Sequence, residues 1–320
     1  MTPNTHPAPA ASIIVPTRGG AGRLPILLES LERQTRRDFE VVVVVDGDVD
    51  GTAAVLEDWA AKHPRMELRS IVFPENRGRS AALNAGNEAA LGGVLIRCDD
   101  DLEPAPEYVH LHITSHTGEM SGVIGLTSNV YPGTSHARAY GTSHDALHHA
   151  NALALPPDKQ WRHWAGNVSL TRAAWELVGG YDEDYRRYGW EDVDYGYRLH
   201  AAGIQVRIVP KLTTRHHVAA TTTAVRAARA LHSGASREIF LRKHGADVLP
   251  APADALTPWN IVVRAVARRI TEPRIRRWGK AVDRVADRLP ATVSRKLVAL
   301  VVESAARAGV KDPARARSTF

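Results

Sequence analysis

The stretch EVVVVVD at residues 40–46 decides the fold of this chain. Five consecutive valines leave no polar face, so the run predicts a strand that is covered on both sides. Such strands belong to parallel sheets with helices on both faces. Asp46, which ends the run, would then lie beyond a carboxyl end of the sheet, where ligands bind in this architecture.

Helical and extended patterns alternate on both sides of this strand through residue 101. The runs SIIVP (12–16), MELRSIVF (66–73) and GVLIRCDDD (93–101) predict three further strands. Apolar residues at helical spacing predict the intervening helices at 23–34, 51–62 and 79–91. This order predicts an open sheet wound with helices through right-handed crossovers.

The second half of the chain carries weaker patterns. We expect helices near 106–117, at 170–178 and at 191–202, and a strand at 204–210, whereas residues 118–165 carry no clear period. From residue 257 the pattern changes to three short amphipathic helices, which Pro273 and Pro290 separate.

Composition limits the classes of protein to which the chain can belong. It has 320 residues, of which 44% are hydrophobic and 24% are charged, as in an ordinary globular protein. A single cysteine, Cys98, rules out an intramolecular disulfide and favours a reducing compartment. We expect a flexible leader at 1–11 with no secretion signal, no membrane-spanning helix, and a cytoplasmic location.

Basic charge is concentrated near the C-terminus. Residues 257–299 hold eleven Lys or Arg and three acids, a net +8, so the rest of this +6 chain is net −2. Amphipathic helices with arginines predict peripheral contact with an anionic membrane surface, here the inner face of the membrane. The alternative is that the helices pack on the rest of the protein and leave their arginines in solvent.

Three consecutive carboxylates follow the fourth predicted strand, at Asp99, Asp100 and Asp101. Mutual repulsion makes such a cluster costly unless a cation or water screens it, and Mg²⁺ or Mn²⁺ prefers oxygen ligands. A solvated acidic strand end is the alternative. His216 and His217 follow the strand predicted at 204–210, and either could add a ligand to a metal site.

A second acidic cluster opens the helix predicted at 191–202. Glu191, Asp192 and Asp194 lie in its first turn, where acids also serve as ordinary helix stabilisers. That role leaves the preceding Trp190 and the surrounding glycines unexplained. A carboxylate at this position could act as a general base.

Four ordered motifs resemble the family 2 inverting glycosyltransferases, which have the GT-A fold. They are SIIVPTRGGAGRLPILLESLERQTRRDFEVVVVVDGDVDGT (12–52), NRGRSAALNAG (76–86), RCDDDLEP (97–104) and GNVSLTRAAWELVGGYDEDYRRYGWEDVDYGYRLHAAG (166–203). The resemblance implies a GT-A-type open mixed sheet over residues 12–250. Its Rossmann-like nucleotide-sugar-binding half would be 12–104, its acceptor-side half 105–250, and 257–320 would be a helical appendage.

The resemblance also implies roles for individual residues. Asp192 would be the catalytic base, with Glu191 positioning hydroxyl groups, and Asp101 would bind the metal with Asp99 as a further ligand. The nucleotide sugar would contact Pro16, Thr17, Arg18, Asp46, Asn76, Gly78, Asp99 and Asp100. The transferred sugar and the acceptor would contact Gly166, Asn167 and Trp190, with Trp190 offering a stacking face.

The implied reaction is metal-dependent transfer of a sugar, with inversion, from a nucleoside-diphosphate sugar to a hydroxyl group. The cofactor would be Mn²⁺ or Mg²⁺, and the acceptor a glycan, a lipid-linked molecule or a small molecule. Two other functions fit the motifs, a nucleotidyltransferase and a catalytically inert nucleotide-sugar-binding protein. The basic tail contains no nucleic-acid-binding motif, so we expect no specific nucleic-acid partner.

Overall fold

The computed structural model describes residues 8–186, 188–217, 220–249 and 256–317. The chain forms two compact units. The first contains residues 1–128, 151–183 and 191–217, and the second contains 129–150, 184–190 and 218–320. Residues 1–7 of the expected leader lie outside the described residues, and Ala11 already belongs to the first strand. The second unit is larger than the appendage expected at residues 257–320. The assignment of residues 12–250 to one functional domain stays a prediction.

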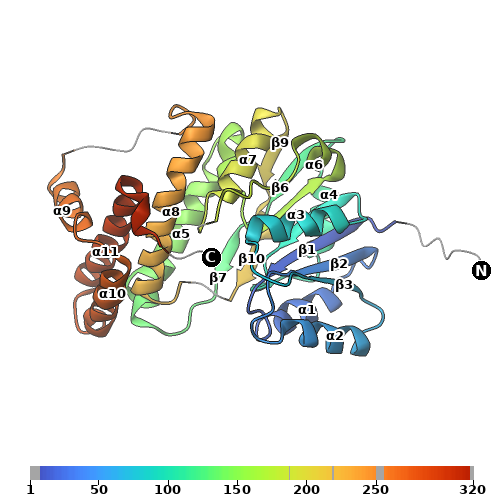
Figure 1. Cartoon of the computed structure of the whole chain (residues 1–320), viewed down its shortest axis with the longest axis horizontal. Helices are drawn as coiled ribbons and strands as arrows, with labels where there is room; N and C mark the ends of the chain where they lie inside the picture. Colours follow the sequence, from blue (N-terminus) through green and yellow to red (C-terminus); the bar gives the residue numbers. More distant parts are fainter. Residues whose placement is uncertain (1–7, 187, 218–219, 250–255, 318–320) are drawn as a thin grey trace, which may run out of the picture. The chain divides into compact units, whose positions relative to one another are not determined.

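A seven-stranded sheet organises the first unit, in the order β3-β2-β1-β4-β8-β6-β9 (Figure 1). Its first four strands and the helices between them confirm the alternating order predicted up to residue 101. They are β1 (Ala11–Thr17), α1 (Leu24–Glu32), β2 (Phe39–Val45), α2 (Thr52–Lys62), β3 (Glu67–Val72), α3 (Arg79–Ala89) and β4 (Val94–Cys98). β1 pairs in parallel with β2 and β4, and β2 pairs in parallel with β3.

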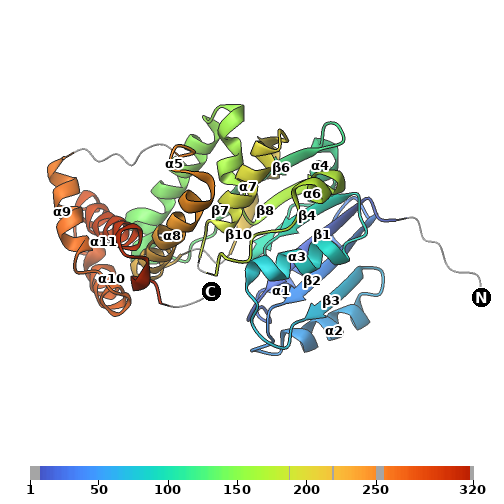
Figure 2. The same cartoon turned by 45° about the horizontal axis from the view of Figure 1, so that its top comes forward.

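Helices cover both faces of this parallel part, with α1 and α2 on one face and α3 on the other (Figures 1 and 2). Val41, Val43 and Val45 of β2 pack in the cluster that holds the leucines of α1. The alternate valines, Val42 and Val44, pack with the alanines of α3. All five are fully buried, which confirms the two-sided burial predicted from their unbroken run.

The rest of the sheet is mixed, as the family resemblance implied. β8 (Asn167–Thr171) runs antiparallel between β4 and β6 (Ser121–Ile124), and β9 (Gln205–Ile208) is parallel to β6. A small sheet has the order β5 (Leu102–Glu103), β10 (Thr214–His216), β7 (Thr127–Asn129). The helices α4 (Tyr108–Ser115), α6 (Arg172–Val178) and α7 (Glu191–Ala201) were predicted, whereas β8 was not. Short 3₁₀ helices lie at Pro157–His163 and Pro210–Leu212.

The second unit is helical. Its elements are a π-helical turn (Ala137–Gly141), most of α5 (Thr142–Leu153), α8 (Thr223–His244), α9 (Pro258–Ala267), α10 (Glu272–Ala286), α11 (Ala291–Lys311) and a 3₁₀ turn (Pro313–Arg315). The last three helices confirm the amphipathic pattern after residue 257. α8 and α11 pack closely because Gly234 and Gly309 lack side chains, and a Cβ on Gly309 would lie 2.0 Å from the Leu231 carbonyl oxygen.

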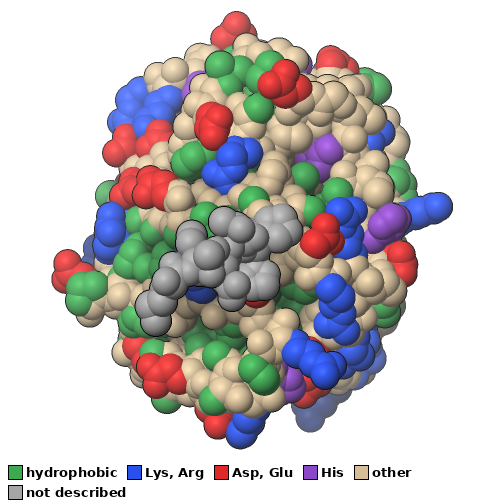
Figure 3. Space-filling model, turned by 90° about the vertical axis from the view of Figure 1, so that its right-hand side faces the viewer, with side chains coloured by type: hydrophobic (Ala, Val, Ile, Leu, Met, Phe, Trp, Pro, Cys, Tyr) green, Lys and Arg blue, Asp and Glu red, His purple; other side chains and the backbone are tan. Residues whose placement is uncertain are grey.

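Within the described ranges, no helix is both long enough and apolar enough to cross a membrane. On the face drawn in Figure 3, acidic and basic side chains are interspersed, in contrast with the strongly basic balance of residues 257–299.

Candidate functional site

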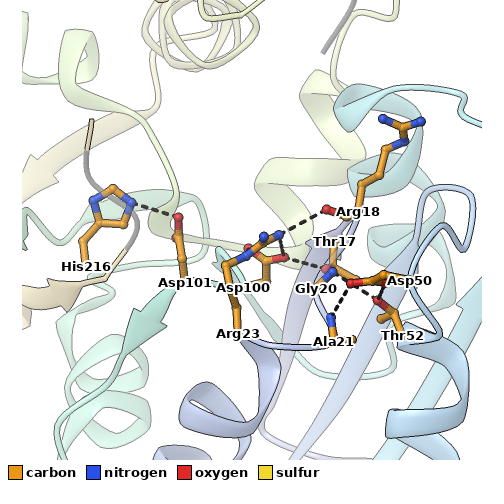
Figure 4. A network of polar contacts seen from close by, with 10 residues as sticks. All are labelled: Thr17, Arg18, Gly20, Ala21, Arg23, Asp50, Thr52, Asp100, Asp101 and His216. Atoms are coloured by element: carbon orange, nitrogen blue, oxygen red, sulfur yellow. Dashed lines mark hydrogen bonds and ion pairs between the residues drawn. The ribbon is translucent and has the colours of Figure 1, made fainter. Parts of the chain in front are cut away.

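Asp100 ties the end of β4 to the loop that follows β1 (Figure 4). Its carboxylate accepts hydrogen bonds from Thr17 Oγ1 at 2.5 Å and from Arg23 Nη2 at 2.6 Å and Nε at 3.2 Å. Asp100 is buried, and this burial raises the pKa of its carboxyl group despite the nearby Arg23. Asp100 and the Thr17 hydroxyl group, both predicted to contact the nucleotide, contact each other and shape the loop.

The same loop is held from the other side by the turn before α2 (Figure 4). Asp50 Oδ2 accepts from the backbone N–H of Ala21 at 3.1 Å, and Thr52 Oγ1 accepts from that of Gly20 at 3.1 Å. Arg18 carries an exposed side chain, whereas Pro16 is buried within β1. Of these two predicted nucleotide contacts, only Arg18 therefore presents its side chain to solvent.

Asp46 organises the loop that precedes α3. Its carboxylate accepts from the backbone N–H of Arg77 at 2.5 Å and of Gly78 at 2.9 Å, and from Asn76 Nδ2 at 3.1 Å. Gly78 has a φ of 95°, which favours glycine at this turn. The structure thus brings together the predicted pocket residues Asp46, Asn76 and Gly78, with the carboxylate of Asp46 bound to the loop.

A buried arginine joins the two acidic motifs. Arg97, on β4, donates from Nε to Asp99 Oδ1 at 2.8 Å, and its Nη1 forms a very short ion pair with Asp192 Oδ1. Only 4% of the Arg97 side chain is exposed. Burial opposes ionisation of Asp99, yet Arg97 and Arg79 hold the pKa of its carboxyl group below the ordinary value. Asp192 therefore lies at the same end of the sheet as the strand-end acids.

Glu191 is the second carboxylate of the α7 start. Its Oε1 accepts from Arg79 Nη1 at 3.3 Å, while Oε2 is buried and has no hydrogen-bond partner within the described ranges. Burial and the neighbouring Asp192 charge raise the pKa of Glu191 to about 7, against the opposing effect of Arg79. A carboxyl group with this pKa can hold or release a proton near neutral pH.

Asp101 and His216 form the arrangement that best fits a divalent cation. β10 pairs antiparallel with β5, so His216 Nε2 lies 3.0 Å from Asp101 Oδ2. The other carboxylate oxygen, Oδ1, is buried and has no hydrogen-bond partner among the described residues. Mg²⁺ and Mn²⁺ are commonly held by one or two carboxylates with substrate phosphates completing the coordination, and Asp101 fits that pattern.

The four metal ligands predicted from the sequence do not come together. Within the described part of the chain, no three His, Cys, Asp or Glu side chains are arranged to hold a metal ion. Asp99 is bound by Arg97, and His217 Nε2 lies 2.6 Å from Glu103 Oε2 rather than against Asp101. His216 rather than His217 therefore lies beside Asp101, because neighbouring residues along a strand point to opposite sides. Asp99 as a further metal ligand stays a prediction.

Asn167 was predicted to contact substrate, and the structure gives it another role. Its side chain is fully buried, and Nδ2 donates to the Leu212 carbonyl at 2.9 Å and to Thr214 Oγ1 at 3.0 Å. Its Oδ1 lies 3.2 Å from His112 Nε2. The amide thus links buried strands and is not available to a sugar. Gly166 remains beside the site, because a Cβ there would lie 2.3 Å from Asp99 Oδ2.

Trp190 belongs to the second unit. Its indole Nε1 donates to Ser233 Oγ at 3.2 Å, and its ring centroid lies 5.2 Å from that of Phe240. It has a φ of 78°, and within the described ranges no other non-glycine residue has a positive φ. The stacking of Trp190 on a sugar stays a prediction.

Sequence reasoning missed three arginines of the site. Arg23, Arg79 and Arg97 each contact a predicted site carboxylate. The one available signal was Arg97, a charged residue inside the otherwise apolar strand run GVLIRC. A charge in a buried strand requires a partner, and acids followed it in the sequence.

Comparison with known proteins agrees with this geometry. Residues 12–168 match the profile described as Glycosyl transferase family 2, and residues 145–221 match the one described as N-terminal domain of galactosyltransferase. Validoxylamine A glucosyltransferase of Streptomyces hygroscopicus subsp. jinggangensis is 30% identical over 234 residues, covering 64% of this chain and 54% of that protein. An undecaprenyl-phosphate 4-deoxy-4-formamido-L-arabinose transferase of Pseudomonas fluorescens is 36% identical over 107 residues, covering 32% of this chain and 31% of that protein.

Solved structures share the fold. A mannosyltransferase from Pyrobaculum calidifontis, in complex with GDP-Man and Mn²⁺, matches with a TM-score of 0.63 and 20% identity, covering 96% of this chain and 88% of that one. S. aureus TarS 1–349 matches with a TM-score of 0.50 and 15% identity, covering 93% and 91%. The chain spans about half the length of the first curated relative that it matches. With the family profile on its N-terminal half and glycosyltransferases among its relatives, the chain belongs to glycosyl transferase family 2 and has the GT-A fold.

Proposed function

We propose that this protein is a metal-dependent inverting glycosyltransferase that moves a sugar from a nucleoside-diphosphate sugar to an acceptor hydroxyl group. The observation that carries the proposal is the bridge from Arg97 to both Asp99 and Asp192. It holds the proposed base next to the strand-end acids, of which Asp101 pairs with His216. The residues proposed for the donor and for the acceptor therefore lie at one end of one sheet.

Asp192 is suited to accept the proton of the attacking hydroxyl group. Arg97 orients the carboxylate through Oδ1, and Oδ2 has no hydrogen-bond partner within the described ranges. As the acceptor oxygen bonds to the anomeric carbon, its proton passes to Asp192 and the bond from that carbon to the diphosphate oxygen breaks. A single displacement of this kind inverts the anomeric centre.

The leaving diphosphate requires neutralisation of its charge. Asp101 and His216 would hold a Mn²⁺ or Mg²⁺ ion, which acts as a Lewis acid toward phosphate oxygens when bound. Glu191, held by Arg79, would position a hydroxyl group of the donor or acceptor. The loops shaped by Asp46 and Asp100 would bind the nucleotide, with Asp99 near the ribose or the transferred sugar.

A donor panel tests the metal part of this proposal. UDP-glucose, UDP-GlcNAc and GDP-mannose are each added with and without Mn²⁺, and the melting temperature and slow donor hydrolysis are recorded. We expect one donor to stabilise the protein only with Mn²⁺ and to release nucleoside diphosphate. Asp101→Asn should lose both effects, whereas Asp58→Asn, an exposed control on α2, should keep them. Equal stabilisation of Asp101→Asn would contradict the metal assignment, and pyrophosphate release would indicate a nucleotidyltransferase.

The base is tested separately. Asp192→Asn should lower turnover of the donor identified above by about 10²–10⁴-fold, because proton acceptance is lost. Its donor affinity should stay within about twofold of wild type, since Asp192 is assigned to the acceptor side. Calorimetric titration with the donor measures that affinity. A parallel collapse of donor affinity would show that Asp192 is a binding residue and not the base.

The acceptor class and the location belong to the same proposal. A glycan, a lipid-linked molecule or a small molecule fits the acceptor role. The relatives include a validoxylamine A glucosyltransferase and an undecaprenyl-phosphate 4-deoxy-4-formamido-L-arabinose transferase. Cytoplasmic location with peripheral contact to an anionic membrane through residues 257–299 stays a prediction. Ile261 and Val262, both substantially exposed, support it, and co-sedimentation with anionic vesicles checks it.

A further inference from the structure

A cavity of about 580 Å³ lies inside the helical unit, between α8 and α10. The two helices are in close contact at Gly279, where a Cβ would lie 2.5 Å from the backbone nitrogen of Ala224. The cavity opens beside this contact and is lined by residues from successive turns of both helices. Its volume is within the range of small-molecule sites in proteins.

The α8 wall of the cavity is mainly apolar. Ala224, Val225 and Ala228 line it, and 42% of the Val225 side chain remains exposed. Binding is favoured when a ligand removes apolar surface of this kind from water. The wall therefore favours a ligand with an apolar body.

Three cations also line the cavity. They are Arg229 on α8 and Arg276 and Lys280 on α10. Arg229 lies over the Tyr188 ring at 5.2 Å from its centroid. Arg276 and Lys280 lie one turn apart, and neither forms an ion pair with any described residue.

The two acids of the cavity already have hydrogen-bond partners within the protein. Asp283 accepts from the backbone N–H of Thr223 at 3.1 Å and from its hydroxyl group at 2.5 Å, at the start of α8. Glu272 Oε1 lies 2.8 Å from His232 Nε2 and accepts from the Arg317 backbone N–H at 3.0 Å. The cations are therefore left to interact with solvent or with a ligand.

We propose that this cavity binds an amphiphile that carries a phosphate group. Arg276 and Lys280 would hold the phosphate, since guanidinium and ammonium groups donate charge-assisted hydrogen bonds to its oxygens. The apolar body would lie on Val225 and Ala228. The lining includes none of the residues assigned to sugar transfer, so the binding test needs no sugar donor and does not depend on the proposed reaction.

Three probes separate the sources of binding energy. Geranyl phosphate, geraniol and inorganic phosphate are titrated into the full chain by calorimetry, without a sugar donor. Geranyl phosphate should bind in a saturable manner and at least about tenfold more tightly than either of the others. If inorganic phosphate binds as tightly, the apolar wall contributes nothing and the amphiphile assignment is wrong. If geraniol binds as tightly, the cations contribute nothing and the proposal is likewise overturned.

Variants then locate the site. Arg276→Gln combined with Lys280→Gln should weaken geranyl phosphate binding by about tenfold or more, and Val225→Asn should weaken it several-fold. Arg277→Gln is the matched control, because Arg277 is exposed on the same helix and does not line the cavity. Equal weakening by Arg277→Gln would indicate general charge attraction and refute the site. All of these positions are at least partly exposed, so the folded chain should tolerate the changes.

Discussion

Replacing Arg97 by Met tests the central contact of the site. Arg97 is the buried cation between Asp99 and Asp192, and methionine keeps much of its length and volume while removing its charge and donors. The variant leaves Asp99, after β4, and Asp192, at the start of α7, without their shared partner. Glu191, which is next to Asp192 and already has a raised pKa, adds a third acid.

The expected cost follows from burial. Removing one partner of a buried ion pair typically costs about 3–5 kcal/mol, because the other charge stays buried and unpaired. The Asp99 and Asp192 side chains keep 24% and 15% of their surface exposed, so water screens them in part. We therefore expect a loss near the lower limit, about 3 kcal/mol in the free energy of unfolding at neutral pH.

The loss should depend on pH in a defined direction. Arg97 holds the pKa of Asp99 in the folded protein below its value in the unfolded chain. The contribution of this contact to the free energy of unfolding is therefore complete above the unfolded-state pKa, and it is lost as the pH falls through the folded-state pKa. In the variant, Arg79 is the arginine that remains beside Asp99, so burial is opposed less strongly and the pKa of Asp99 rises. The stability gap between wild type and variant should thus narrow as the pH falls toward about 4.

Urea unfolding followed by circular dichroism at pH 7.5 and pH 4.5 measures both effects. Arg36→Met is the control, since Arg36 makes a 2.6 Å ion pair with Asp38 in which the side chains are 30% and 52% exposed. An exposed pair contributes about 0–1 kcal/mol, so the control should change little. If Arg97→Met is no more destabilising than Arg36→Met, or its cost is the same at both pH values, the assigned role of Arg97 is wrong.

Two further predictions concern the buried polar core beside the site. Asn167→Ala should lower the free energy of unfolding by about 3 kcal/mol, because the Leu212 carbonyl and the Thr214 hydroxyl group lose their donor. The control Asn151→Ala, at an exposed position, should change the free energy of unfolding by less than about 0.5 kcal/mol. Burial lowers the pKa of His112 from 6.5 to about 3, so wild-type stability should fall as pH drops below 6.5 and the unfolded chain gains a proton. His112→Gln should reduce that slope by up to about 1.4 kcal/mol per pH unit in urea titrations, and an unchanged slope would contradict the buried neutral state.

The parallel half of the fold could be predicted from the sequence because its signals are local. An unbroken valine run requires cover on both faces, and β2 has it from α1 and α3. Acids that directly follow an apolar run must lie beyond the strand end, as Asp46 and Asp99 do. β8 was missed because it pairs with strands distant in the sequence and its five residues carry no period that distinguishes it from the helix after them.

The partners of the site side chains were decided by tertiary structure. Arg97 and Asp192 are 95 residues apart, and no local pattern states that they meet. The choice of His216 over His217 follows from the register of β10 on β5, in which a slip of one residue would exchange the two side chains. Sequence alone thus determined which acids end the strands, through local hydrophobic periodicity. Pairing register and burial, which depend on the whole fold, decided which of those acids bind arginine and which one contacts His216.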